Sequence, residues 1–185
     1  MTIKASLIFK EIVEPMLKVI GIPYKMEHTE YRDHAKELVQ NLNSDLIRSI
    51  FTVSGDGLFH EVINGILSRP DWEKASKYLP IGTIGAGTSN AMSKNLDALT
   101  QVESTFGIIK GKTTLMDVFS IVQNGQVTYS HLSVTWTLIA DLDLDSETYR
   151  WMGSFRVVFG ALIRLMNMRS YSGRVYMLPI DYDDS

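Results

Sequence analysis

The stretch Ser54-Gly55-Asp56-Gly57-Leu58-Phe59-His60-Glu61 decides how this sequence is interpreted. Residues 46–53 before it form an apolar run typical of a buried strand, and residues 62–67 after it have the composition of a helix. A strand that ends at glycines and continues as a helix predicts the carboxyl edge of an open α/β sheet, where ligands bind. The carboxylate of Asp56 at this edge favours a proton acceptor or an indirect metal contact over simple phosphate binding. A turn in which Gly-Asp-Gly only satisfies backbone geometry explains the tripeptide equally well.

A second glycine-rich turn follows the next predicted strand. Residues 79–84 are strand-like and end in Gly85-Ala86-Gly87-Thr88-Ser89-Asn90, after which Ala91 and Met92 begin a helix. We expect the two turns at the same edge of one sheet, where backbone N–H groups and helix N-termini favour phosphate. Neither turn is a Walker loop or a dinucleotide fingerprint, because Gly-Lys-Ser/Thr and G-x-G-x-x-G are both absent.

Helices and strands alternate in the rest of the first half. Helical spacing over residues 5–13 continues past Pro15 to residue 20, residues 23–28 alternate like a strand, and residues 35–43 are again helical. This order predicts a parallel sheet with crossover helices. A doubly wound domain usually opens with a strand, so we expect that an element is missing at the front.

The pattern of the second half is antiparallel. Residues 115–122 and 127–139 are strand-like, and Asn124-Gly125 between them is a strong hairpin signal. The sequence therefore predicts an α/β fold, in which a parallel-sheet nucleotide-binding domain is followed by the start of an antiparallel, β-rich and truncated second domain. The predicted domains are residues 1–112 and 113–185.

Composition and charge exclude several classes of protein. The 185 residues are 45% hydrophobic, which predicts a folded core, and a net charge of −3 does not favour nucleic-acid binding. There is no cysteine, and the four histidines lack metal-ligand spacing, so we predict no disulfide and no zinc site. The longest apolar run, residues 157–163, is too short to cross a bilayer. We expect a soluble, cytoplasmic protein that can contact a membrane surface.

Two charged clusters in the second half each have more than one interpretation. Asp141, Asp143 and Asp145 are spaced so that they share one face of a strand, either in solvent or facing a cation. An EF-hand is excluded, because its sixth and twelfth positions hold Ser146 and Met152.

The second cluster consists of arginines beside an apolar stripe at helical spacing. It predicts a helix with a solvated basic face, an anion clamp, or a helix on anionic lipid. The arginines are Arg150, Arg156, Arg164, Arg169 and Arg174.

These residues resemble the catalytic domain of the diacylglycerol kinase type. The stretch Ser54 to Leu58, followed by His60-Glu61-Val62 and Asn64-Gly65, is similar to the signature of that family. Its serine-first, leucine-last form resembles the sphingosine (sphingoid long-chain base) kinases, as do Arg69-Pro70-Asp71-Trp72-Glu73 and the run from Ile139 to Arg156. The resemblance covers roughly residues 4–179. Ser89 stands where the family usually has a glycine.

The resemblance implies an ATP-dependent lipid kinase that phosphorylates the primary hydroxyl of a sphingoid base, with ATP and Mg²⁺ and no protein-held metal. It implies that Asp56 is the catalytic base and that Ser54, Gly55, Asp56, Gly57 and Asp143 bind the lipid head. The residues that it implies for ATP are Thr29, Glu30, Tyr31, Arg32, Asp33, Glu61, Gly87, Thr88, Ser89, Arg150 and Arg156.

Two alternatives to a sphingoid-base kinase stay open. A ceramide or diacylglycerol kinase shares the same signature, although the acids at 141–145 suit an ammonium group better than a neutral lipid. A non-catalytic fragment that binds a partner or a membrane surface is the other. The resemblance also implies that the family's opening strand and nucleotide loop are absent, so we expect a fragment associated peripherally with membranes.

Overall fold

The computed structural model describes residues 3–137, 140–142, 155–166, 170–174 and 176. The chain forms two compact units, Met1–Ser133 and Val134–Ser185. Both glycine turns and all the strands found in the described part belong to the first unit.

The first unit opens with a helix that has a wider turn in its middle. It consists of α1 (Ile3–Ile8), the π-helical η1 (Phe9–Val13) and α2 (Glu14–Val19). The N–H of Glu14 donates to the carbonyl of Phe9, five residues earlier, and Pro15 follows without an N–H of its own. A π turn just before a proline fits, because the proline cannot continue the regular hydrogen-bond pattern. The helices expected over residues 5–13 and 16–20 are therefore confirmed.

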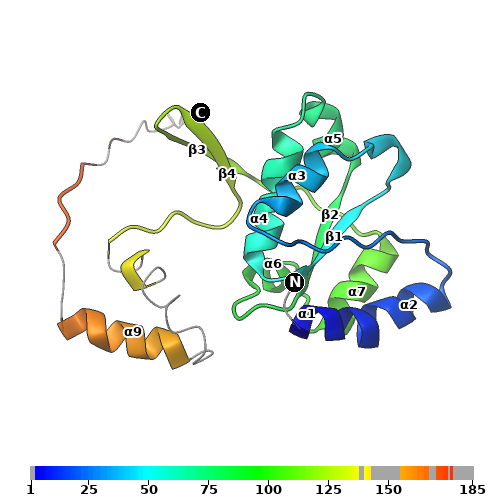
Figure 1. Ribbon diagram of the computed structural model, residues 1–185, viewed down its shortest axis with the longest axis horizontal. Helices are drawn as coiled ribbons and strands as arrows, with labels where there is room; N and C mark the ends of the chain where they lie inside the picture. Colours follow the sequence, from blue (N-terminus) through cyan, green and yellow to red (C-terminus); the bar gives the residue numbers. More distant parts are fainter. Residues whose placement is uncertain (1–2, 138–139, 143–154, 167–169, 175, 177–185) are drawn as a thin grey trace, which may run out of the picture. The chain divides into compact units, whose positions relative to one another are not determined.

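A parallel sheet forms the centre of the first unit (Figure 1). In the described residues it has two strands, β1 (Ile50–Ser54) and β2 (Ile81–Gly85), which pair in parallel from Ile50 opposite Ile81 to Ser54 opposite Gly85. The hydroxyls of Thr52 and Thr83, opposite one another, are buried and hydrogen-bonded at 3.2 Å. Both strands therefore end at the same edge, as the two glycine turns predicted.

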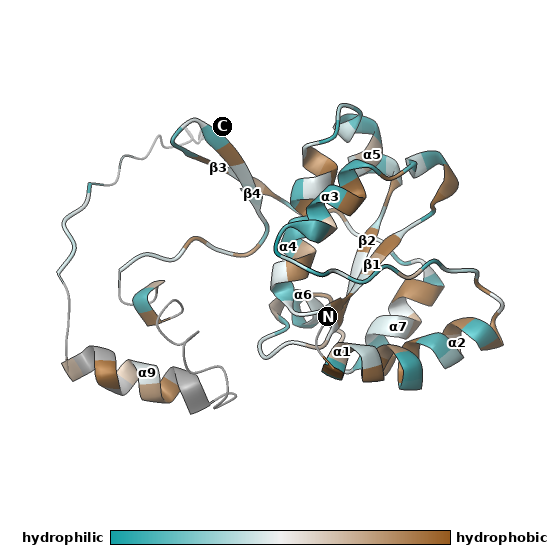
Figure 2. Cartoon of the chain, in the orientation of Figure 1, coloured by the Kyte–Doolittle hydropathy of each residue, from teal (hydrophilic) through white to brown (hydrophobic). Residues whose placement is uncertain are grey.

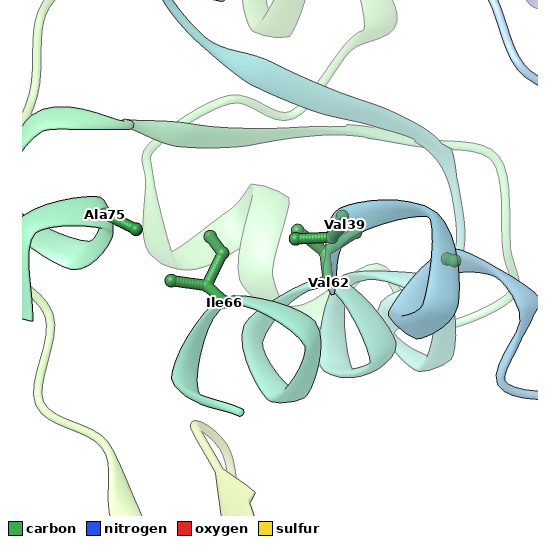
Figure 3. Packing of buried hydrophobic residues seen from close by; sticks show 5 residues of the cluster. Val39, Val62, Ile66 and Ala75 are labelled. Carbon is green, nitrogen blue, oxygen red and sulfur yellow. The ribbon is translucent and has the colours of Figure 1, made fainter. Parts of the chain in front are cut away.

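Three helices cover one face of this sheet. They are α3 (His34–Gln40), α4 (Asp56–Leu67) and α5 (Trp72–Tyr78). Val62 and Ile66 of α4 pack with Val39 of α3 and Ala75 of α5, as Figure 3 shows, and Ile50 and Ile81 of the strands lie against this cluster. The short 3₁₀ turn η2 (Ser44–Leu46) leads from α3 towards β1.

The opening helix and α7 (Gln101–Lys110) cover the other face. Phe9, Val13 and Leu17 pack with Ile84 of β2, and the cluster also includes Phe51 and Val53 of β1. Alternate strand residues therefore contact opposite helical layers, which is the expected period of two. Figure 2 shows the resulting apolar interior, with teal segments along the outer helical surfaces.

An antiparallel hairpin completes the first unit. It consists of β3 (Phe119–Gln123) and β4 (Gln126–Ser130), with Tyr129 opposite Ser120. The φ angles of Asn124 and Gly125 are 52° and 76°. Positive φ at both central residues is typical of the tight hairpin turn that Asn-Gly predicts. Phe59 and Ile63 of α4 and Met92 of α6 (Ala91–Asn95) form a third cluster, against which Met116, Val118 and Tyr129 pack.

Several sequence predictions about elements were wrong. Residues 23–28 form no strand, although Tyr24, Met26 and His28 alternate. The first strand begins at Ile50 rather than 46, and the long strand expected over 127–139 ends at Ser130. Helices α5 and α7 were not predicted.

The second unit contains α9 (Phe155–Met166), which confirms the helix expected from the apolar stripe. Residues 140–142 are helical rather than extended, and the hydroxyl of Tyr171 donates to the carboxylate of Asp141 at 2.7–2.8 Å. Within the part of the chain that the structure describes, no helix is long and apolar enough to cross a membrane.

Candidate active site

The two glycine turns touch one another at the carboxyl edge of the sheet. The N–H of Ala86 donates to the carbonyl of Ser54 at 2.9 Å, which extends the parallel ladder by one bond. A Cβ added at Gly87 would lie 2.7 Å from the Cα of Gly55, and one added at Gly55 would lie 3.3 Å from the Cα of Gly87. Close backbone approach therefore requires glycine at position 87 and leaves little room for a side chain at position 55, where φ is negative.

Asp56 begins α4 between these turns, and its carboxylate holds the start of α6. Its Oδ2 accepts the N–H of Ala91 and its Oδ1 accepts the N–H of Met92, each at 3.0 Å. A carboxylate at a helix N-terminus satisfies amide donors that have no partner within the helix. Each oxygen still has a second lone pair, so the half-buried carboxylate can also accept a hydrogen bond from a substrate hydroxyl.

Asn90 closes the second glycine turn. Its Oδ1 accepts the N–H of Gly87 at 2.8 Å, and its Nδ2 donates to the carbonyl of Gly87 at 3.0 Å. Asn90 has φ 48°, a left-handed conformation that asparagine tolerates better than most residues. The side chains of Thr88 and Ser89 are exposed at the tip of this turn, so they are accessible to a ligand.

The loop over residues 29–33 has an ordered aromatic stack. The rings of Tyr31 and His34 lie parallel with centroids 4.4 Å apart, and the Tyr31 hydroxyl donates to Glu37 at 2.6 Å. This hydrogen bond raises the pKa of the Tyr31 phenol. The N–H of Glu30 donates to Nδ1 of His34 at 3.1 Å. Arg32 is exposed, 3.9 Å from the carboxylate of Asp33.

Glu61 repeats on α3 what Asp56 does on α6. Its Oε2 accepts the N–H of Ala35, in the first turn of α3, at 3.1 Å. Asp33 precedes α3 with φ 66°, as Asn90 precedes α6 with a left-handed φ. The two loops for which the family resemblance implies ATP contacts thus each end in a left-handed residue. Each is followed by a helix whose first amides donate to an acid of α4. This places one rigid helix in contact with the ends of both loops.

Two histidine rings lie near one another at α4, His60 on the helix itself and His131 beside it. His131, just after β4, packs edge-on against Phe59 with ring centroids 5.0 Å apart, and its ring is 6.3 Å from that of His60. Both ring nitrogens of His131 are buried, and neither has a hydrogen-bond partner among the residues that the structure describes. Burial lowers the pKa of His131, the charge of His60 lowers it further, and the charge of Asp56 opposes the shift.

The remaining predicted site residues are only partly described. Ser54 ends β1, where its hydroxyl donates to the carbonyl of Gly55 at 2.9 Å, and Gly57 is exposed in the first turn of α4. Asp143 and Arg150 lie outside the described residues. Arg156 belongs to α9, but its side chain is not among those described.

The described residues do not include a dedicated metal site. Within the ranges the structure covers, no three histidine, aspartate or glutamate side chains come together as metal ligands.

Residues 4–121 match the family described as the diacylglycerol kinase catalytic domain. The chain belongs to this family.

Curated relatives narrow the resemblance to one branch. Sphingosine kinase 2 of Arabidopsis thaliana is 41% identical over 177 residues, which cover 93% of this chain and 37% of that protein. Human sphingosine kinase 2 is 36% identical over 181 residues, covering 92% and 28%. Sphingoid long chain base kinase 4 of Schizosaccharomyces pombe is 35% identical over 185 residues, covering 97% and 39%. The chain thus spans well under half of each of these relatives, and the resemblance to sphingoid-base kinases is confirmed.

Sequence reasoning missed two asparagines that shape the site. The sequence predicts Asn90 only as the last residue of a turn, and it predicts Asn64 only as part of the family motif. The position of Asn90 directly before a helix could have indicated that it ends the turn. Asparagine is a preferred residue before a helix, and it tolerates the left-handed conformation. Asn64 contacts the backbone of a strand 65 residues further along the chain, and no local pattern predicts such a contact.

Proposed function

We propose that this chain is the catalytic part of an ATP-dependent lipid kinase that transfers the γ-phosphoryl group to the primary hydroxyl of a sphingoid base. The observation that carries the proposal is the position of the Asp56 carboxylate beside two glycine turns whose backbones touch. Backbone at such turns can approach phosphate closely, and a carboxylate beside it can orient an incoming hydroxyl.

The proposed roles of the second glycine turn and of the loop over 29–33 follow from which of their groups are accessible to a ligand. The exposed tip of the second turn, Thr88 and Ser89, is proposed to contact the nucleotide phosphates, since the N–H of Gly87 is already used by Asn90. The loop over 29–33, with its Tyr31 and His34 stack, is proposed to contact the nucleoside. Magnesium is proposed to arrive as part of MgATP, because phosphate oxygens and water are its usual ligands.

Asp56 is proposed to accept the proton of the lipid hydroxyl while the oxygen attacks the γ-phosphorus. The bond between that phosphorus and the β,γ-bridging oxygen breaks, so the products are the lipid phosphate and ADP. Phosphoryl transfer of this kind needs positioning and charge neutralisation more than covalent chemistry from the protein. The α6 amides that bind Asp56 keep its carboxylate at a fixed place.

The second half of the chain is proposed to supply the lipid head-group contact and further phosphate contacts. Asp143 is the proposed partner of the ammonium group, and Arg150 and Arg156 are proposed to bind phosphate oxygens. We also propose that residues 1–112 are the nucleotide-binding part and residues 113–185 the start of a β-rich lipid-binding part. Contact with a membrane surface is proposed because the lipid substrate resides there.

The test is phosphoryl transfer from MgATP to sphingosine by the wild-type protein and by Asp56→Asn. The variant is expected to lose roughly 10²–10⁴-fold in kcat, because a positioned proton acceptor contributes about that factor. Nucleotide affinity should change much less, since one carboxamide oxygen still caps α6. Glu103→Gln is the matched control, because Glu103 also caps a helix with its carboxylate but lies in the capping box of α7.

Three outcomes would contradict the proposal. Near-normal kcat in Asp56→Asn would show that Asp56 is not the proton acceptor. Equal losses in Glu103→Gln would mean that helix capping alone explains the effect. Phosphorylation of ceramide or diacylglycerol in preference to sphingosine would assign the chain to a neighbouring lipid kinase.

A further inference from the structure

Asn64 makes a two-point contact between α4 and the backbone of the hairpin. Its Oδ1 accepts the N–H of Tyr129 at 2.9 Å, and its Nδ2 donates to the carbonyl of Tyr129 at 2.8 Å. The same Nδ2 donates to the carbonyl of His60, one turn earlier on α4, at 2.9 Å. Asn64 is 6% exposed, so these bonds form away from bulk water.

The side-chain amide of Asn64 makes the two hydrogen bonds to β4 that the backbone of a neighbouring strand would otherwise make. In an antiparallel pair, every second residue points both its N–H and its C=O away from the partner strand. Tyr129 lies opposite Ser120 of β3, and the N–H and C=O of Tyr129 both bond to Asn64 instead of to β3. The outward edge of β4 is therefore paired to α4 at this residue, and a shift of β4 by one residue would break both bonds.

Asn64 lies on the same side of α4 as Asp56. Asp56, His60 and Asn64 are each four residues apart, so they follow one strip of the helix. At 1.5 Å per residue, Asn64 lies about 12 Å along the axis from Asp56. The helix is a rigid spacer over that length, so fixing Tyr129 on Asn64 also fixes the hairpin relative to Asp56 (Figure 1).

The apolar contacts between α4 and the hairpin do not define which residue of β4 lies against Asn64. Phe59 and Ile63 pack with a cluster that includes Met116, Val118 and Tyr129. Burial of apolar surface is non-directional, and it tolerates small sliding of one element over another. Paired hydrogen bonds to one residue's N–H and C=O are directional and tolerate very little.

We propose that Asn64 is a positioning residue, which sets the register of the β3–β4 hairpin on the helix that carries Asp56. This role rests on the proposed function, in which the segment following the hairpin supplies contacts to the lipid. The nucleotide loops do not depend on Asn64, because Glu61 and Asp56 hold the starts of α3 and α6 through their own bonds.

The test compares Asn64→Leu with Val62→Ala in the whole chain. Leucine has the same number of side-chain heavy atoms and the same branching at Cγ as asparagine, but it leaves both backbone groups of Tyr129 without the bonds that Asn64 makes. Val62→Ala is the matched control, since Val62 is as deeply buried on α4 but packs against α3 and α5. Hydrogen exchange at the Tyr129 amide and steady-state kinetics with sphingosine and MgATP are measured for both.

For Asn64→Leu we expect the Tyr129 amide to exchange at least about tenfold faster, while amides in the middle of α4 keep their protection. Its kcat/KM for sphingosine should fall roughly 10- to 100-fold, since small misplacement of reacting groups has effects of that size. Its KM for ATP should change by no more than about threefold, because only Arg150 and Arg156 among the proposed ATP contacts follow the hairpin. Val62→Ala should leave the exchange rate of the Tyr129 amide, the kcat/KM for sphingosine and the KM for ATP near their wild-type values.

Unchanged exchange at Tyr129 in Asn64→Leu would overturn the proposal. So would faster exchange without any loss in kcat/KM for sphingosine, because Asn64 would then be structural only. If Asn64→Leu does not fold, Asn64→Asp answers the same question, since it keeps the acceptor for the Tyr129 N–H and removes the donor to its carbonyl. A wild-type chain that phosphorylates no lipid would refute the proposed function, and the exchange data would still decide whether Asn64 holds the hairpin.

Discussion

At the scale of single residues, two acids of α4, Asp56 and Glu61, hold the starts of neighbouring helices. Asp56 and Glu61 were expected as a catalytic base and an ATP contact, and both are found accepting backbone N–H groups from other helices. Substitution of either acid therefore changes the position of a loop as well as the chemistry of a carboxylate. A loss of activity after such a substitution needs a helix-capping control before it is assigned to catalysis.

His131 predicts a pH dependence of stability. Burial lowers the pKa of its imidazole below the ordinary value of 6.5, so the folded state binds this proton less readily than the unfolded state. The stability contributed by neutral His131 is therefore present above about pH 6.5 and is lost as the pH falls towards its folded pKa. Urea unfolding at about pH 7.5 and pH 5.5 is expected to show lower stability at the acid value.

The control for this effect is His131→Phe, which keeps an aromatic ring against Phe59 and removes the titrating group. The variant should show a smaller drop in stability between the two pH values. The charges of His60 and Asp56 also act on this ring, so the two proteins are compared at the same ionic strength. An identical drop in wild type and variant would show that other groups are responsible.

At the scale of elements, Arg69 joins α3 to the turn before α5. Its guanidinium donates to the carbonyls of Val39 and Leu42 at 2.8 and 2.7 Å and binds the carboxylate of Asp71 through two nitrogens at 2.7 and 3.0 Å. Arg69 is 8% exposed. Arg69→Ala is expected to destabilise the fold by roughly 3 kcal/mol, because the carbonyls of Val39 and Leu42 lose a charged donor and the two-pronged bond to Asp71 is lost.

The matched variant for this site is Asp71→Asn, which removes only the charge of the partner. The side chain of Asp71 is 40% exposed, so loss of its charge should destabilise the fold clearly less than Arg69→Ala does. Chemical unfolding of both variants measures the difference. Equal costs would mean that the ion pair, and not the carbonyl contacts, makes Arg69 important.

The contact between the two glycine turns gives a second prediction for elements. In Gly87→Ala the new Cβ would lie 2.7 Å from the Cα of Gly55, and backbone cannot rotate out of the way as a side chain can. We expect a loss of about 1–3 kcal/mol, typical of overpacking, measured by thermal unfolding. Gly107→Ala in α7 is the control, since its Cβ would meet no atom within 4 Å and should stabilise the helix by up to about 1 kcal/mol. A Gly87→Ala variant as stable as wild type would mean that the turns can separate freely.

The sequence predicted local elements well where their signals were local. Strand, glycine turn and helix were found twice, and the Asn124-Gly125 hairpin once, because each depends on neighbouring residues. Helix α7 was missed, although Thr100 and Glu103 form a capping box that is readable three residues apart. The strand expected over residues 23–28 was wrong because alternation shows only that a segment can pair, not that a partner strand lies beside it.

The site was predictable in outline and not in its contacts. That the two turns share one edge follows from parallel strands, and the structure confirms it. The capping by Asp56 and Glu61 and the contact of Asn64 with Tyr129 join residues 26 to 65 positions apart. Such contacts depend on how helices pack around the sheet, which periodicity does not specify. The roles of Asp143, Arg150 and Arg156 stay predictions.

At the scale of the whole molecule, the three apolar clusters found among the described residues lie within residues 1–133. A fragment of these residues therefore retains the packing that stabilises both sheets. We predict that it folds alone and unfolds cooperatively, within a few degrees of the midpoint for the 185-residue chain, by circular dichroism. It should bind MgATP more weakly than the whole chain and phosphorylate no sphingosine, because the proposed contacts at Asp143, Arg150 and Arg156 are removed. A fragment that fails to fold would show that the first unit depends on residues after 133.

The tight turn of the hairpin also determines how the protein ages chemically. Asparagine followed by glycine is the pair most prone to deamidation. The next backbone nitrogen attacks the side-chain amide, ammonia leaves, and water opens the resulting succinimide to an isoaspartate. Two such pairs occur, Asn64-Gly65 and Asn124-Gly125. Asn64 is buried within a helix, where the backbone nitrogen of Gly65 cannot reach its amide, whereas Asn124 lies in an exposed turn with the conformational freedom that this attack needs. An isoaspartate adds one atom to the main chain, so a damaged turn would no longer match β3 to β4, and preparations of this protein would become heterogeneous first at Asn124.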